Sequence, residues 1–123
     1  MPLYTISSQD GALSPEEQAA LAAEITEFHC QMAGPDKAFV KIIFTTFAPG
    51  EGFVGGEAAA AVILTVLIRA GRSSDYKRDM LRKLWAILQR ATMATDEQML
   101  VAIQEAPASN AMEMGQIMPE LAE

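Results

Sequence analysis

The sequence is poor in residues that several common functions require. Its one cysteine, Cys30, cannot form an internal disulfide framework and fits a reducing compartment. Its one histidine, His29, stands beside that cysteine, and the pair alone makes no plausible zinc site. Basic residues number 9 against 16 acidic ones, and the net charge of −7 argues against a general nucleic-acid binder. We therefore expect no metal, no cofactor and no nucleic-acid partner.

Long apolar segments are also missing. The longest mainly apolar run, residues 58–68, is too short to span a bilayer. The chain opens Met-Pro-Leu-Tyr-Thr-Ile, without the basic and apolar pattern of a signal sequence. Half of the 123 residues are hydrophobic, which is enough for one compact core. We expect a single cytoplasmic domain over residues 1–123 that does not enter the membrane.

The few basic residues are concentrated in one segment. Seven of the nine lie between Arg69 and Arg90, opposed only by Asp75 and Asp79, so this segment is near +5 and the rest near −12. A local basic region in an acidic chain can attract a small anion without attracting polyanions broadly. Most of these residues fit the solvated face of a helix, but Arg69 and Arg72 precede it.

The first half of the sequence predicts a strand, a helix and a second strand. Residues 3–7 alternate and are rich in β-forming residues. Ser14-Pro-Glu-Glu17 is a capping box that starts a helix, and Gly34-Pro35 ends it. Residues 39–47 predict the second strand, and residues 52–56 a short strand or hairpin. The core-facing positions of the helix are predicted at Leu21, Ile25, Phe28 and Met32.

The second half repeats this order. Residues 61–68 predict a buried strand, and the loop at residues 69–75 ends in a Ser/Asp helix cap. A helix follows to about Thr92, and residues 99–104 predict the fourth main strand. The tail from Pro107 shows no clear period. The buried positions of the second helix are predicted at Leu81, Leu84, Trp85 and Leu88.

The two halves, approximately residues 1–60 and 61–123, share a unit of about 60 residues. We predict an α+β layer built from two tandem β-α-β units, with a four-stranded mixed sheet and two helices on one face. Right-handed crossovers make the paired strands within each unit parallel. The uncovered sheet face and the methionine-rich tail favour association with further copies of the chain.

Pro2 is the most informative residue for chemistry. Methionine aminopeptidases generally remove Met1 when a small residue such as proline follows. Removal would leave a secondary amine at the start of a core strand. Burial lowers the pKa of such an amine and nearby carboxylates raise it, so it could act as a general acid or base near neutral pH. Many chains begin Met-Pro without using the proline, so other residues must support this role.

Four further residues could complete a site with Pro2. His29 lies near the end of the first predicted helix. Arg69 and Arg72 stand three residues apart before a helix start, and their guanidinium groups suit a carboxylate. Glu113 lies among apolar neighbours, where a partly buried carboxylate could act on a proton. Cys30 is interpreted as a packing residue.

In this order and spacing the residues resemble the tautomerase superfamily, and specifically its cis-3-chloroacrylic acid dehalogenase group. The resemblance covers nearly the whole chain. It rests on the Met-Pro start, residues 7–10, the helix with His29, the Arg69-x-x-Arg72-Ser loop, and Pro107 followed by Glu113-x-Gly115.

The resemblance implies a homotrimer of doubled β-α-β subunits with the active site around the amino-terminal proline. It implies that Pro2 is the catalytic amine, and that Arg69, Arg72 and His29 hold or polarise a substrate carboxylate. It also implies that Glu113 positions or activates water. The expected activity is keto-enol tautomerisation of small 2-oxo or 2-hydroxy unsaturated carboxylic acids.

One position departs from the dehalogenase pattern. Ala102 stands where that group has a tyrosine that assists in activating water, and alanine has no hydroxyl to donate or accept a hydrogen bond. Efficient hydrolytic dehalogenation is therefore not expected, and any hydratase or dehalogenase activity should be weak. Two alternatives remain open: a module that binds a small anion for regulation, and an inactive relative that keeps the fold.

Overall fold

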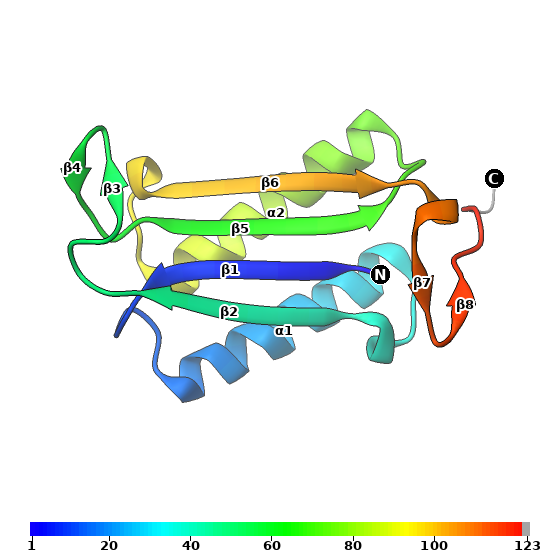
Figure 1. Cartoon of the computed structure of the whole chain (residues 1–123), viewed down its shortest axis with the longest axis horizontal. Coiled ribbons are helices and arrows are strands. Elements are labelled where there is room, and N and C mark those ends of the chain that lie inside the picture. The colour runs from blue at the N-terminus through cyan, green and yellow to red at the C-terminus, as the bar shows by residue number, and fades with distance from the viewer. Residues whose placement is uncertain (122–123) are drawn as a thin grey trace.

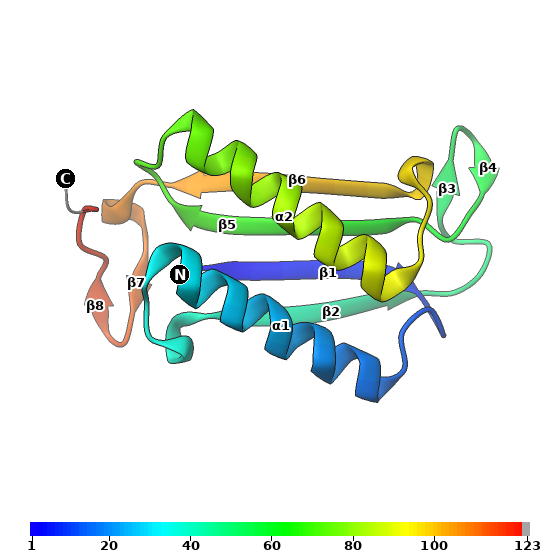
Figure 2. The same ribbon diagram turned by 180° about the vertical axis from the view of Figure 1, so that it is seen from behind.

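The computed structural model describes residues 1–121 as one sheet backed by two helices (Figure 1). The sheet has four strands in the order β2 (Lys41–Phe47), β1 (Leu3–Gln9), β5 (Val62–Arg69) and β6 (Met99–Ala106). The helices are α1 (Pro15–Ala33) and α2 (Ser74–Thr92). Figure 2 shows both helices in front of the same face of the sheet. The predicted two-layer β-α-β fold is confirmed.

The pairing of the strands follows from this topology. β1 pairs in parallel with β2, and β5 with β6, as right-handed crossovers require. The two units meet where β1 and β5 run antiparallel, with Thr5 opposite Thr65. Because these central strands are antiparallel, the beginning of β1 lies beside the end of β5, and Leu3 is opposite Leu67. Residues from both halves of the chain therefore meet at this end of the sheet.

The predicted helix signals are present as side-chain contacts. The Ser14 hydroxyl accepts from the backbone N–H of Glu17, and the Glu17 carboxylate accepts in return from the N–H of Ser14. Gly34 ends α1 in the left-handed conformation, with φ of 82°. Ser73 caps α2 by accepting from the N–H of Tyr76. These caps place the end of α1 and the start of α2 at the same end of the sheet (Figure 2).

The predicted bounds of the four main strands differ from the structure by one or two residues: β1 extends to Gln9, and β5 begins at Val62 and ends at Arg69. The strand predicted from residue 39 starts at Lys41, because Asp36 caps a 3₁₀ turn at Lys37–Phe39. The fourth main strand is longer than predicted and reaches Ala106. A second 3₁₀ turn, Asp96–Gln98, precedes that strand, and a third, Ala108–Asn110, follows it.

The tail, for which the sequence shows no period, forms a hairpin. Its strands are β7 (Met112–Glu113) and β8 (Gln116–Ile117), joined by Met114 and Gly115, both with positive φ. Strands of two residues are too short to show an alternating pattern. The predicted hairpin in the first half is β3 (Phe53–Val54) with β4 (Glu57–Ala58), and β7 starts 59 positions after β3. Ser14 and Ser73 are the same distance apart.

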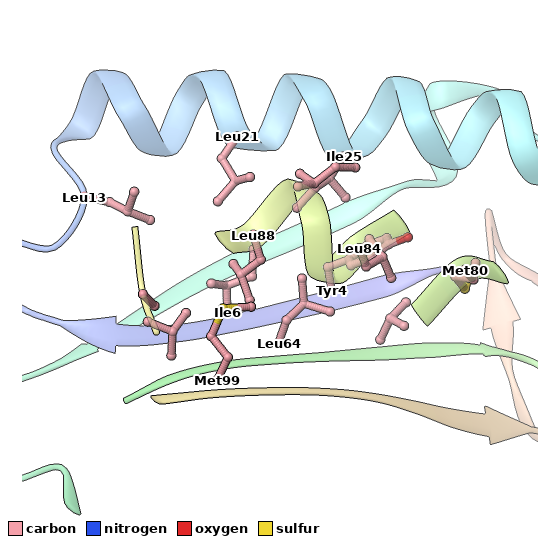
Figure 3. Close-up of a cluster of buried hydrophobic side chains, with 14 of the residues drawn as sticks. Tyr4, Ile6, Leu13, Leu21, Ile25, Leu64, Met80, Leu84, Leu88 and Met99 are labelled. Atoms are coloured by element: carbon pink, nitrogen blue, oxygen red, sulfur yellow. The ribbon is translucent and has the colours of Figure 1, made fainter. Parts of the chain in front are cut away.

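The core lies between the helices and the sheet (Figure 3). Alternate residues of β1 and β5 point into it, while the intervening ones face away from the helices. Leu21 and Ile25 of α1 are buried as predicted, and Phe28 and Met32 are half-buried against the core. The fully buried side chains include Tyr4, Ile6, Leu21, Ile25, Leu64, Val66, Met80, Leu84 and Leu88.

The buried face of α2 differs in part from the prediction. Leu84 and Leu88 are buried, but Leu81 and Trp85 are only half-buried. The other buried positions are occupied by Met80 and Ile87. The helix therefore turns a slightly different face to the sheet than its leucine spacing indicates.

The other face of the sheet is not covered by any described element. Ile43 on β2 and Leu100 on β6 lie on it and are 55% and 49% exposed. Within residues 1–121, no helix is both long enough and apolar enough to cross a membrane.

Candidate active site

A small cavity of about 50 Å³ opens at the end of the sheet where the two halves meet. Four of the five residues predicted for a site line it: Pro2, His29, Arg69 and Arg72. They come from the residue before β1, the last turns of α1, the last residue of β5 and the loop before α2. The central antiparallel pair explains this convergence, because it puts the start of β1 beside the end of β5.

Pro2 is fixed by its place next to the sheet. Its side chain is less than 2% exposed, and its carbonyl accepts a hydrogen bond of 3.1 Å from the backbone N–H of Lys41. Met1 precedes it and also lines the cavity. The chain end is therefore held in place, whereas chain ends are usually frayed.

His29 is a buried, neutral side chain with a defined partner. Its Nδ1 lies 2.7 Å from the hydroxyl oxygen of Tyr4, and the two rings meet edge to face. Burial, the Arg72 guanidinium and the positive chain terminus lower the pKa of His29 to about 4. Burial also raises the pKa of Tyr4, so its hydroxyl keeps the proton. The hydroxyl can then donate to Nδ1, which leaves the proton of the neutral ring on Nε2.

The two arginines are held in different ways. Arg69 donates from one terminal nitrogen to the carbonyl of Pro119 at 2.6 Å, while its buried Nε has no hydrogen-bond partner within residues 1–121. Arg72 lies over the ring of Tyr76, 4.7 Å from its centre, which is a cation–π contact. Arg69 ends strand β5 and is not part of the loop in which the sequence placed it. Both guanidinium groups border the same cavity as His29.

Glu113, the fifth predicted residue, is brought to the site by the tail hairpin. It lines an adjoining cavity of about 320 Å³, which shares Met1, Pro35 and Arg69 with the smaller one. Its side chain is 10% exposed and contacts the Met1 ammonium group. Its Oε2 atom is buried without a hydrogen bond to any described residue and lies 3.9 Å from Nζ of Lys41. Burial, Lys41 and Arg69 lower the pKa of the Met1 ammonium to about 6.

Ala102 lies apart from both cavities. It pairs with Thr65 in the middle of the sheet and sits on the face that the helices do not cover. A side chain at this position could reach an active site only across a boundary between two copies of the chain.

Residues 1–121 contain no group of three His, Cys, Asp or Glu side chains that could hold a metal ion.

Three residues at the site were not predicted from the sequence: Tyr4, Tyr76 and Lys41. The sequence could have indicated Tyr4, because alternate residues of a strand share a face and Tyr4 follows Pro2 on that face. No sequence pattern indicates the approach of Lys41 to Glu113, because it depends on where the tail hairpin folds back.

We predict that Tyr4→Phe will alter the tautomer of His29. Without the hydroxyl, Nδ1 loses its donor, and the proton on Nε2 is no longer favoured. The loss of a buried hydrogen bond corresponds to about a tenfold decrease in any rate that depends on Nε2 as a donor. NMR of the imidazole nitrogens reads the tautomer directly, because His29 is the only histidine. Tyr76→Phe, which keeps the ring under Arg72, should leave that spectrum unchanged; an unchanged spectrum in Tyr4→Phe would contradict the assignment.

Comparisons with known proteins agree with this fold. A family model described as "Putative oxalocrotonate tautomerase enzyme" matches residues 1–123. The crystal structure of native Ps01740 has 32% sequence identity and a TM-score of 0.86, over 90% of this chain and 99% of that one. N1, a member of the cis-3-chloroacrylic acid dehalogenase family, has 29% identity and a TM-score of 0.87, over 96% and 84%.

A more distant structure has the same fold. A fused 4-OT described as a symmetric trimer has 20% identity and a TM-score of 0.84, over 94% of each chain. A search of curated protein sequences gave no significant match. The match over the whole chain and the shared fold confirm the expected resemblance. This chain belongs to the tautomerase superfamily, in the family described as putative oxalocrotonate tautomerase.

Proposed function

We propose that this protein is an amino-terminal-proline tautomerase, which interconverts the keto and enol forms of small 2-oxo carboxylic acids. The observation that carries the proposal is the small cavity, where a buried Pro2 meets His29 and two arginines from distant parts of the chain. Arg69 and Arg72 together form a carboxylate-binding pair, which we call the carboxylate clamp. Such a clamp beside a potential amine base is the minimum that this reaction requires.

Catalysis by Pro2 requires removal of Met1. In the chain that keeps Met1, the nitrogen of Pro2 is part of a peptide bond and cannot take up a proton. The Met1 ammonium already contacts the Glu113 carboxylate, so the new amine would form close to that carboxylate. Burial and the cations Lys41 and Arg69, which lower the pKa of the Met1 ammonium, would also lower the pKa of this amine, whereas the Glu113 carboxylate would raise it. A lowered pKa leaves more of the amine neutral and able to act as a base near pH 7.

The proposed mechanism assigns one task to each group. Arg69 and Arg72 bind the substrate carboxylate, and the Nε of Arg69, which no residue of the described part of the chain pairs with, is available for one of these contacts. His29 donates from Nε2 to the carboxylate or to the oxygen on C2. Neutral Pro2 accepts the proton of the enol hydroxyl and delivers a proton to C3. The O–H bond breaks, a C–H bond forms, and the enol becomes the ketone.

Hydration or dehalogenation would need the opposite protonation state of Pro2. A cationic Pro2 would donate a proton at the α-carbon while Glu113 directs water to the β-carbon. The alanine at position 102 disfavours this route, because it cannot help to activate water. We therefore propose tautomerisation as the main activity, with only weak hydratase or dehalogenase activity.

We also propose that the protein is a homotrimer. The face of the sheet without helices exposes Ile43 and Leu100, and the tail hairpin exposes Met112, which lines neither cavity. Apolar surface of this extent is more typical of an interface than of a monomer. The fused 4-OT with the same fold is described as a trimer, which supports this state for the present chain.

The test uses ketonisation together with covalent labelling. Enzyme whose loss of Met1 has been verified by intact mass is expected to accelerate the ketonisation of phenylenolpyruvate above the buffer rate. It is then treated with 2-oxo-3-pentynoate, which inactivates the similar protein Pt0534. A neutral amine adds to the alkyne carbon, its proton moves to the neighbouring carbon and nothing leaves, so the mass increases by one whole reagent.

We expect one equivalent of label on the amino-terminal peptide and a parallel loss of activity. Ketonisation no faster than in buffer would refute the enzyme assignment and favour an anion-binding module or an inactive relative. Activity that survives full labelling of Pro2 would refute its role as the base.

A further inference from the structure

The larger cavity differs in chemistry from the smaller one that it adjoins. The smaller cavity, about 50 Å³, is bordered by the two arginines and His29 and has room for little more than a carboxylate. The larger one, about 320 Å³, is bordered mainly by apolar side chains, with Phe39, Ile117, Met118 and Pro119 among them. A cavity of about 150 Å³ is enough to hold a benzene ring. The larger cavity therefore has room for an apolar substituent of a substrate anchored in the smaller one.

The charges around the larger cavity disfavour a second carboxylate. Among the described residues that line it, Arg69 is the one with a cationic side chain, and it stands at the border with the smaller cavity. Glu113 presents a buried carboxylate to the larger cavity. Lys41 is near Glu113 but its side chain is 54% exposed and does not line the cavity. An added carboxylate would lose its water, meet a like charge and find no free cation.

We propose that this site selects 2-oxo monocarboxylic acids that carry an apolar or aromatic group, over diacids such as oxalocrotonate. The carboxylate binds in the smaller cavity and the apolar group enters the larger one. Met1 lines both cavities, so its removal opens the boundary between them. Selectivity in catalysis rests on the proposed function, whereas the preference in binding can be measured without turnover.

Three unreactive acids with the same acrylate core test the preference by calorimetry. Crotonate carries a methyl group, cinnamate a phenyl ring and muconate a second carboxylate. With the processed protein, we expect cinnamate to bind about tenfold or more tightly than crotonate, because the ring buries more apolar surface. Muconate should bind no more tightly than crotonate. Muconate binding as tight as cinnamate binding, or no binding of cinnamate, would overturn the proposal.

A charge introduced into the larger cavity should reverse the preference. Ile117→Arg places a cation on β8 at the cavity wall, and we expect muconate to gain and cinnamate to lose about tenfold in affinity. Met93→Arg is the control, because Met93 is exposed after α2 and lines neither cavity. This variant should bind the three acids in the same order of affinity as the wild type. Equal behaviour of the two variants would contradict the assigned role of the cavity.

These outcomes separate the inference from the proposed function. Cinnamate binding without ketonisation of phenylenolpyruvate would remove the proposed activity and keep the selectivity. Ketonisation with equal kcat/KM for phenylenolpyruvate and the enol of oxalocrotonate would keep the activity and remove the selectivity. If Ile117→Arg does not fold, as judged by circular dichroism, the comparison of the three acids on the wild type still decides the question.

Discussion

Protein that keeps Met1 should ketonise phenylenolpyruvate about 10²- to 10⁴-fold more slowly than the processed form, the range expected for losing a positioned acid or base. The reason is chemical, because the nitrogen of Pro2 has no basic lone pair while it belongs to a peptide bond. The Met1 amine cannot replace it, since it lies one residue away, against Glu113. Inhibiting methionine aminopeptidase during expression gives the two forms from one sequence, and intact mass distinguishes them. Equal kcat/KM values would remove Pro2 from the mechanism.

Pro2→Ala is the matched variant, because alanine also permits removal of Met1. It leaves a primary amine at the same point of the chain but loses the buried ring that fixes it. Its kcat/KM should fall between those of the two wild-type forms.

The pH dependence gives a further check on the protonation state of Pro2. A base acts in its neutral form, so kcat/KM should rise with pH through the pKa of the Pro2 amine and then level off. His29 should contribute no change above pH 5, because its pKa is about 4. A rate that falls as the pH rises through this range would indicate a cationic Pro2 and favour the hydration route.

Much of the site could be predicted because it depends on topology. Once residues 3–7 and 61–68 are identified as strands of two linked β-α-β units, the first strand must begin where the other central strand ends. That places Pro2 beside Arg69, and the helix caps at Gly34 and Ser73 bring His29 and Arg72 to the same end. Each of these steps follows from a strong local signal, such as a capping box or strict alternation.

The rest depends on contacts that leave no local pattern. The position of Glu113 is set by a hairpin of two-residue strands, which is too short to have a period. The bond between Tyr4 and His29 joins residues 25 positions apart and needs both the strand face and the helix face to be known. The buried face of α2 is decided by packing against the sheet, which places Met80 inside and leaves Leu81 half-buried.

Arg72→Ala should lower kcat/KM for phenylenolpyruvate by about 10²-fold or more, because each hydrogen bond to a charged group contributes about 1.5–3 kcal/mol and a guanidinium can make two to one carboxylate. Arg72→Lys should recover little of this loss. Lysine keeps the charge but lacks the planar fork and stacks less well on Tyr76. Arg78→Ala is the matched control, since Arg78 is exposed, pairs with Asp75 and lines neither cavity.

The pKa of His29 distinguishes the loss of the Arg72 guanidinium from general damage to the site. After burial, the Arg72 cation is the largest cause of the lowered pKa of His29. Removing it should therefore move the pKa of His29 upward, toward its ordinary value, and Arg72→Lys should move it much less. NMR titration of the single histidine measures this shift without any substrate. If the pKa stays near 4 in Arg72→Ala while activity is lost, the guanidinium does not face His29 as the structure places it, and the carboxylate clamp must be reassigned.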